Sequence, residues 1–256
     1  MKLFTNEIVF RGHPDKVCDQ ISDAILDACL KEDKNSRCGI EVMGGKGKIF
    51  ITGEVTTKAK ININKIVKRV LKDVGYSNDY EIINNLGVQS PDIALGTNNI
   101  INGAGDNGMM FGYACNDNDN YLPTAMVILQ TFSKEYDELR KKDKRFLPDG
   151  KAEITGYYEL EKLKKIKTFT ICYQNTEENR EQTDQIIKDL ATKITKKQKS
   201  IRKNGCFFIA RKKRWGNSSS LIFLFLSEKP ANIAENIADA VKVDLCLDAF
   251  NDRRGA

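Results

Sequence analysis

The sequence is poor in the residues from which small metal centres and disulfide frameworks are built. It contains a single histidine, His13, and its 7 cysteines include no Cys-x-x-Cys pair. A structural zinc site needs four Cys or His ligands, so a site of this kind is not expected. An odd number of cysteines in a chain of 256 residues also argues against a disulfide framework. We therefore expect most of the thiols to be small buried groups that stay reduced.

Long apolar runs are also absent from the sequence. The longest, residues 221–226, is far shorter than the roughly 20 residues of a membrane-spanning helix, and it suits a buried strand. The first ten residues show neither the apolar core nor the cleavage pattern of a secretory signal. The sequence therefore predicts a cytoplasmic protein without a membrane segment.

The composition is that of a globular protein, with 41% hydrophobic and 30% charged residues. The length suits one large domain or two modest ones. A net charge of +6 is compatible with polyphosphate substrates, nucleic acid or an acidic partner, and it does not choose among them.

The spacing of apolar residues predicts two similar units. The expected elements are a helix at 14–31, strands at 38–43 and 48–55, a helix at 64–74, a helix at 123–142, strands at 151–158 and 167–173, a helix at 178–199, a strand at 221–226 and a helix at 233–250. The order strand, strand, helix occurs twice, which predicts an α+β fold with helices on one face of each sheet. Residues 84–120 are rich in Asn, Gly and Asp and are interpreted as a long loop of the kind that is often functional.

The segment 12–16 reads Gly-His-Pro-Asp-Lys at a predicted helix start. A helix N-terminus favours phosphate, because its free N–H groups and dipole carry positive charge there. Lys16 would add a cation, Asp15 can hold Mg²⁺ together with phosphate oxygens, and His13 can donate a hydrogen bond to a leaving oxygen. An ordinary explanation is also open: Asp15 caps the helix, Lys16 is solvated and His13 lies in a loop.

Three further segments carry suitable residues. Glu41 and Glu54 lie on neighbouring predicted strands, where they either project to a common site or face solvent. The glycine-rich segment 103–113 could let its backbone approach a ligand closely, although surface turns look the same. Residues 148–151 read Pro-Asp-Gly-Lys, which taken alone is an ordinary turn.

Taken together and in this order, these segments resemble the S-adenosylmethionine synthetases. The resemblance covers residues 3–5, 12–24, 53–57, 89–93, 103–114 and 148–151. The His-Pro-Asp-Lys segment and the Gly-Ala-Gly-Asp loop are its most specific parts. It is firm over residues 3–158 and weak from there to about 209.

The resemblance implies that the sulfur of L-methionine attacks C5′ of ATP, and that the triphosphate chain leaves and is hydrolysed before release. Such a displacement needs a positioned nucleophile and charge stabilisation of the leaving group. By resemblance, His13 and Lys16 are the catalytic candidates and bind ATP together with Asp149 and Lys151, while Glu54, Gln89 and Asp106 hold methionine, Asp15 binds Mg²⁺ and Glu41 belongs to a K⁺ site. The family also implies three similar α+β units and a homodimer, or a higher homo-oligomer, with active sites between subunits.

The sequence departs from the family after Ile209. Family members continue with segments that supply cations for the polyphosphate and a second Mg²⁺ site, whereas this chain continues with Ala-Arg-Lys-Lys-Arg-Trp-Gly at 210–216. The third unit is missing or reduced. We therefore expect an N-terminal unit at 1–110, a central unit at 111–215 and a residual segment at 216–256.

Three hypotheses arise for the function. The chain is a shortened synthetase in which the basic residues 211–214 replace the lost cations, a catalytically inactive relative that binds a ligand or regulates a full-length synthetase, or a truncated remnant. We favour the first, because the N-terminal motifs are intact.

A nucleic-acid interface is a hypothesis of a different functional class. Residues 193–214 hold 10 Lys/Arg, no acidic residue and two phenylalanines. We prefer to interpret that stretch as a solvated helix face followed by a core strand.

Overall fold

The computed structural model describes residues 1–77, 79–90, 109, 111–176, 179–197, 206–215 and 218–226, the last two ranges as strands only. The elements in chain order are β1 (Lys2–Val9), α1 (Pro14–Glu32), β2 (Arg37–Gly45), β3 (Lys48–Thr56), α2 (Ile63–Val74), β4 (Glu81–Gly87), α4 (Thr124–Lys142), β5 (Phe146–Glu159), β6 (Lys162–Asn175), α5 (Arg180–Lys197), β7 (Cys206–Trp215) and β8 (Ser218–Leu226). The predicted α+β class is confirmed.

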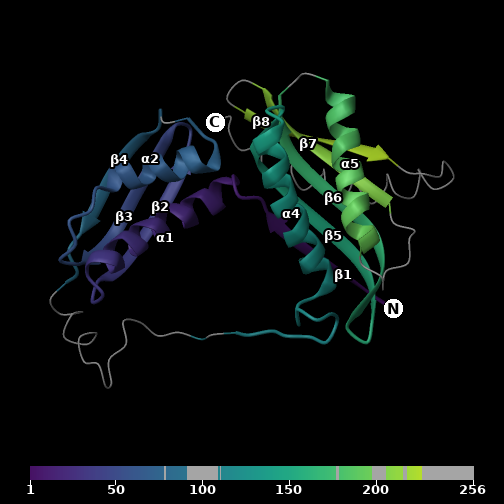
Figure 1. The fold of residues 1–256 in the computed structure, drawn as a ribbon, viewed down its shortest axis with the longest axis horizontal. Helices are drawn as coiled ribbons and strands as arrows, with labels where there is room; N and C mark the ends of the chain where they lie inside the picture. Colours follow the sequence, from purple (N-terminus) through teal and green to yellow (C-terminus); the bar gives the residue numbers. More distant parts are fainter. Residues whose placement is uncertain are drawn as a thin grey trace, which may run out of the picture.

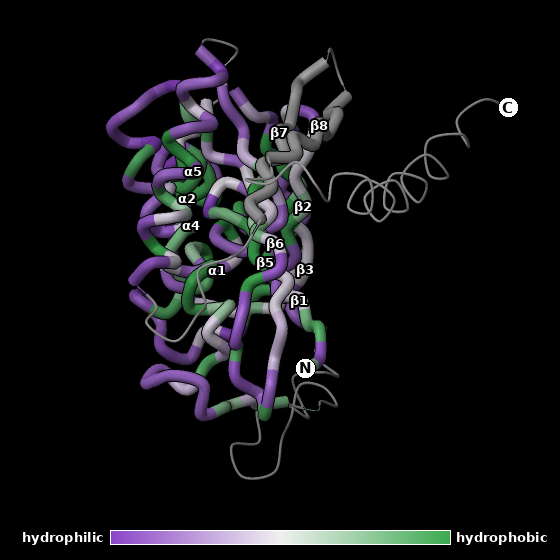
Figure 2. Tube along the Cα trace, turned by 90° about the vertical axis from the view of Figure 1, so that its right-hand side faces the viewer, coloured by the Kyte–Doolittle hydropathy of each residue, from purple (hydrophilic) through white to green (hydrophobic). Residues whose placement is uncertain are grey.

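The described elements form two sheets, each covered by helices on one face. One sheet has the order β2-β3-β4 and the other the order β1-β5-β6-β7-β8. Unit one denotes α1, β2, β3, α2 and β4, and unit two denotes the second sheet with α4 and α5. Figure 1 shows the helices of both units in front of their sheets, and Figure 2 shows helices on one side and strands on the other. The uncovered faces of the two sheets therefore point the same way.

The two units repeat one order of elements, as the sequence predicted. Each has a helix, an antiparallel hairpin, a second helix and a strand that returns parallel to the second hairpin strand. β2 pairs antiparallel with β3 and β3 parallel with β4, just as β5 pairs antiparallel with β6 and β6 parallel with β7. A parallel return needs a crossover, which α2 and α5 provide.

β1 lies in the sheet of unit two. It pairs antiparallel with β5, from Lys2 opposite Tyr158 to Val9 opposite Lys151. The expected division of the chain at 110 assigns these residues to the first unit, whereas their hydrogen bonds join them to the second sheet. The expected division into units stays a prediction.

The extent of the predicted loop at 84–120 was wrong at its start. β4 runs to Gly87, with Ile82 opposite Ile49 and Asn85 opposite Thr52 of β3. Two asparagines in succession hid the strand, because they carry no apolar alternation. Residues 91–108 and the helix expected at 233–250 lie outside the described residues.

The core of each unit lies between its helices and its sheet. In unit one, α1 buries Val17, Ile21, Ile25 and Cys29, which recur every fourth residue and so share one helix face. In Figure 2 the apolar residues gather between the two layers. No helix in the described part of the chain is long and apolar enough to cross a bilayer.

Candidate functional site

The start of α1 carries three of the predicted site residues. His13 is the residue that caps the helix: its backbone is extended (φ −62°, ψ 138°) and its Nδ1 accepts a hydrogen bond from the backbone N–H of Asp15 at 3.3 Å. The ordinary explanation in which Asp15 itself caps α1 was wrong, because its side chain points into solvent and is 89% exposed. The Lys16 ammonium lies 3.3 Å from Asp19.

The segment 12–16 is in contact with the segment 148–151, more than 130 residues away. A Cβ built on Gly12 would lie 2.3 Å from Pro148 Cβ, so the two backbones touch. Two residues before Gly12, the Phe10 N–H donates to the Gly150 carbonyl at 2.8 Å, and a Cβ on Gly150 would meet the Phe10 ring at 2.5 Å. We call this contact the joint. Only glycine fits at positions 12 and 150, since any larger residue would separate the two segments.

Tyr76, two residues after the last residue of α2, also reaches the joint. Its hydroxyl donates to the Gly12 carbonyl at 2.5 Å, and burial followed by the nearby Asp149 charge raises its pKa. Asp149 itself is buried, with 6% of its surface exposed. The four predicted ATP contacts, two on each segment, are thus carried by adjoining parts of the backbone.

Lys151 is held on the uncovered face of the second sheet by a residue that the sequence did not single out. Its Nζ lies 2.7 Å from Glu7 Oε2 on β1. Burial alone would lower the pKa of Lys151, but the hydrogen bond and charge of Glu7 outweigh it and raise that pKa. Two pairs along the ladder from Lys151, and on the same face of the sheet, Glu7 lies opposite Glu153. Burial, and then the charge of Glu7, raises the pKa of Glu153.

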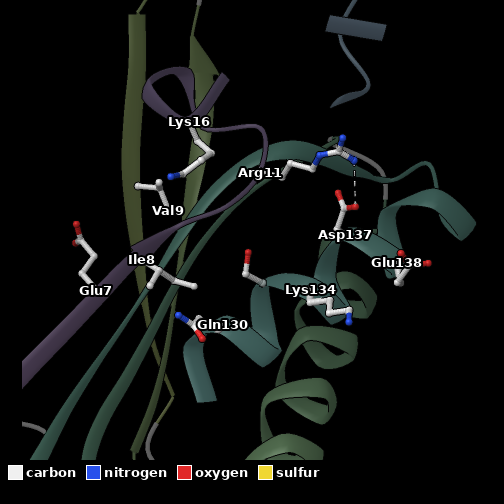
Figure 3. Close-up of a pocket in the computed structure, with 10 residues that line it drawn as sticks. Glu7, Ile8, Val9, Arg11, Lys16, Gln130, Lys134, Asp137 and Glu138 are labelled. Atoms are coloured by element: carbon white, nitrogen blue, oxygen red, sulfur yellow. Dashed lines mark ion pairs between the residues drawn. The ribbon is translucent and has the colours of Figure 1, made fainter. Parts of the chain in front are cut away.

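A pocket of about 640 Å³ lies beside the joint, between β1, the start of α1 and α4. Figure 3 shows Glu7 and Lys16 on one side of it and residues of α4 on the other. It is lined by Glu7, Ile8, Val9, Arg11, Lys16, Gln130, Ser133, Lys134, Asp137 and Glu138. Lys16 lines this pocket, so one of the predicted ATP contacts borders it.

A second pocket of about 550 Å³ is lined by both segments of the joint, through Pro14 on one side and Pro148 and Asp149 on the other. The turn between β2 and β3 and the rings of Tyr76 and Tyr80 complete its wall. Predicted ATP contacts therefore border both pockets.

The predicted methionine contacts of the described residues lie at the other end of unit one, and the predicted K⁺ residue lies in the middle of β2. Glu54 is opposite Gly39 on β2 and Gly87 on β4, and Gln89 follows Gly87 by two residues. Glu41 is opposite Thr52, so it shares the uncovered sheet face with Glu54, and both are exposed. Asp106 lies outside the described residues.

Within one chain the described methionine contacts are remote from the joint. The C-terminal end of α1 contacts the end of β3 just after Glu54, since Asp33 accepts a hydrogen bond from the Lys58 N–H at 2.9 Å. His13 caps the opposite end. α1 has 19 residues, which at 1.5 Å each gives about 28 Å between the two groups.

The donor set for metals is sparse. Among the residues that the structure describes, no three His, Cys, Asp or Glu side chains gather as a ready-made metal site. The exposed carboxylate of Asp15 fits Mg²⁺, an ion that binds through one or two carboxylates together with substrate phosphates. Glu41 offers one exposed carboxylate to a K⁺ ion.

Comparison with known proteins gives consistent matches. The S-adenosylmethionine synthetase N-terminal domain matches residues 1–91, and the central domain of that family matches residues 101–214. The S-adenosylmethionine synthase of Clostridium tetani (strain Massachusetts / E88) is 39% identical over 209 residues, which cover 73% of this chain and 54% of the relative. That of Synechococcus sp. (strain CC9605) is 40% identical over 196 residues, or 69% and 48%. The chain spans about half the length of the curated relatives it matches.

Proposed function

Because the chain belongs to the S-adenosylmethionine synthetase family, we propose that it forms S-adenosylmethionine from ATP and L-methionine and releases the triphosphate chain. The observation that carries the proposal is the joint, where the Gly-His-Pro-Asp-Lys segment packs on the Pro-Asp-Gly-Lys segment. Local secondary structure does not bring together residues so far apart in sequence, so their contact is a product of the tertiary fold. Their contact places two predicted ATP-binding segments against each other.

In the proposed reaction the methionine sulfur forms a bond to C5′ of ATP while the bond from C5′ to the triphosphate oxygen breaks. The electron pair stays on that oxygen, and His13 donates a hydrogen bond to it. Lys16 and Lys151 stabilise the negative charge of the leaving chain. Lys151 must exchange the Glu7 carboxylate for a phosphate oxygen when ATP binds, since the two are paired at 2.7 Å.

The metal ions have a defined place in this proposal. Mg²⁺, held by Asp15 and the phosphates, would offset the charge of the polyphosphate. Glu41 would contribute to a K⁺ site on the uncovered face of unit one, beside the methionine contacts Glu54 and Gln89. Asp106 is proposed as a methionine contact from the sequence resemblance alone.

A homodimer is part of the proposal, because one chain separates its two groups of site residues by about 28 Å. A two-fold axis brings the far end of one subunit to the near end of the other. The uncovered sheet faces point the same way (Figure 2), and the exposed side chain of Met43 lies on one of them. Light scattering should give twice the mass of the chain, and a strict monomer would contradict a shared site.

One observation favours a second candidate function. Residues 210–216 read Ala-Arg-Lys-Lys-Arg-Trp-Gly where the family resemblance implies a segment that supplies cations for the polyphosphate. Without those groups the chain would bind ATP or methionine without turnover, as a regulatory partner of a full-length synthetase. A cytoplasmic location stays a prediction in both cases.

The test is an assay with ATP, L-methionine, Mg²⁺ and K⁺ in which S-adenosylmethionine, triphosphate, pyrophosphate and phosphate are separated by chromatography. We expect product, with Asp15→Asn and Lys16→Ala abolishing it. Asp27→Asn and Lys31→Ala, which are exposed positions further along α1, should retain it. Binding without product would favour the regulatory candidate, and neither binding nor product would reject both.

A further inference from the structure

The chain passes from unit two to unit one through a very short connection. Phe10 is buried in the core of unit two, and His13 caps α1 of unit one. Arg11 and Gly12 are all that lies between them. The orientation of α1 against β5, and with it the geometry of the joint, therefore depends on how this connection is held.

Arg11 contacts three helices, each through a different nitrogen atom. Its Nε donates to Gln20 Oε1 of α1 at 3.1 Å, its Nη2 pairs with Asp73 of α2, and its Nη1 lies 3.6 Å from Asp137 Oδ2 of α4. Figure 3 shows the guanidinium above Asp137. Two of these helices belong to unit one and the third to unit two, so this side chain spans the boundary between the units.

The surrounding groups keep both ends of this contact in place. Gln20 donates to the backbone carbonyls of Arg11 and Lys16, each at 2.9 Å, which fixes the connection on the first turn of α1. Asp137 also pairs with Arg140 and Lys141. Burial opposes ionisation of Asp137, but these two cations outweigh it and lower its pKa. The carboxylate is therefore charged at neutral pH and anchored to α4.

We propose that Arg11 is a positioning residue for the ATP site: it couples the two units and so holds His13 and Lys16 against Asp149 and Lys151. The inference rests on the proposed function for the identity of the ligand. A guanidinium is required, because its rigid fork presents several donors at once, whereas a lysine ammonium is a single point charge. On α1 it contacts Gln20, in the half of that helix next to the joint, whereas Glu54 lies near the other end of α1, so we expect no effect on the methionine contacts.

The experiment compares the wild type with Arg11→Ala, Arg11→Lys and the control Arg69→Ala, which removes the same charge from an exposed position on α2. Affinities for Mg·ATP and for L-methionine are measured separately by calorimetry. We expect both Arg11 variants to bind Mg·ATP about tenfold more weakly, a change typical of coupling between sites. Their methionine affinity should stay within about twofold of the wild type, and Arg69→Ala should match the wild type for both ligands.

Hydrogen exchange provides a readout that needs no ligand. The amides of Phe10 and His13 are bonded to Gly150 and Phe10, and in the Arg11 variants we expect them to exchange about tenfold faster while the hairpins of both sheets are unchanged. If the wild type binds no ATP but these amides loosen, the proposed function fails and the coupling role stands. Unchanged exchange, or ATP affinity equal to that of the wild type in Arg11→Ala, would overturn the inference.

Discussion

The two units share one order of elements and fill their cores with different residues. Every buried side chain in the core cluster of unit one is aliphatic or cysteine. The cluster of unit two contains the aromatic residues Phe10, Phe132, Tyr136, Phe146, Phe169 and Tyr173. Large rings suit the five-stranded sheet, since each buries 150–250 Å² or so and fills a wider space than a valine or an isoleucine does.

The aromatic core leads directly into the joint, whereas the aliphatic core borders the second pocket, through Val17 among others. Phe10 packs on Phe132 and on Tyr136, with ring centroids 5.8 and 4.8 Å apart, and its backbone leads directly into the joint. The Tyr136 hydroxyl donates to the Leu147 carbonyl at 2.8 Å, next to Pro148. Unit two therefore acts as the fixed support of the joint, and unit one presents the start of α1 to it.

The largest effect should come from opening the aromatic core. Phe132 is fully buried between Phe10 and Phe169. We expect Phe132→Ala to lower the free energy of unfolding by about 4 kcal/mol, since truncation of a buried ring loses apolar contact and leaves a cavity. Urea unfolding followed by tyrosine fluorescence measures this change, because most of the buried rings lie in unit two.

The corresponding truncation to alanine in unit one should cost less. Ile25 is equally buried on α1, and Ile25→Ala removes a smaller side chain than a phenyl ring, at about 3 kcal/mol. Equal losses for the two variants would contradict the view that the aromatic core contributes more to stability than the aliphatic core.

The next largest effect should come from the joint itself. A Cβ at Gly12 would lie 2.5 Å from the Pro148 backbone, which cannot move aside as a flexible side chain can. We expect Gly12→Ala to cost about 3 kcal/mol, at the upper end for overpacking, and to weaken Mg·ATP binding. Gly45→Ala is the control, because a Cβ there meets no atom within 4 Å. Wild-type ATP affinity in Gly12→Ala would separate the joint from the ligand site.

Most of unit one could be predicted from the sequence, because its signals are local. α1 follows an uninterrupted four-residue spacing of apolar side chains, and α2 is capped by Asn62 before its first residue and by Gly75 after its last, residues typical of such positions. β1 could not be placed in the same way. Its partner, β5, lies about 140 residues further along the chain, and no local pattern specifies such a pairing.

The residues of the candidate site likewise fall into those that a sequence motif indicates and those that only a long-range contact reveals. Its motif segments were found through their resemblance to a family, and the joint shows why two of them occur together. Glu7, Arg11 and Tyr76 were missed, since each matters through a contact with a residue distant in sequence. A carboxylate opposite Lys151 becomes meaningful only once the register of β1 and β5 is known.

The units also differ in how their helices begin, and substitutions at these positions should have effects of intermediate size on stability. In unit one, Asn62 caps α2 locally by accepting from the Lys65 N–H at 2.9 Å. In unit two, Asp117 accepts from the Thr124 N–H at the start of α4 at 2.8 Å and from the Leu163 N–H of β6 at 3.2 Å. We expect Asp117→Ala to cost about 2 kcal/mol, because two backbone donors lose a charged acceptor, and Asn62→Ala about 1 kcal/mol. Thermal unfolding measures both, and the reverse order would mean that local capping dominates.

The smallest effect should come from the uncovered face of unit two. Burial, followed by the charge of Glu7, raises the pKa of Glu153 in the folded state. The folded state therefore holds the Glu153 proton more tightly than the unfolded chain does, so this group costs stability as pH rises through the unfolded value of about 4.3 and then the folded value. Replacement by the neutral Glu153→Gln should stabilise the protein at pH 7 by less than about 1 kcal/mol, because the site is partly screened by solvent.

The pH dependence of this gain distinguishes charge from shape. At pH 4 the wild-type carboxyl is already largely protonated in the folded state, so the advantage of Glu153→Gln over the wild type should shrink toward zero. Glu159→Gln, at the exposed end of the same strand, should match the wild type at both pH values. A gain of equal size at pH 4 and pH 7 would mean that the amide packs better than the carboxyl. In that case the repulsion between the carboxylates of Glu7 and Glu153 would not be the cause of the change in stability.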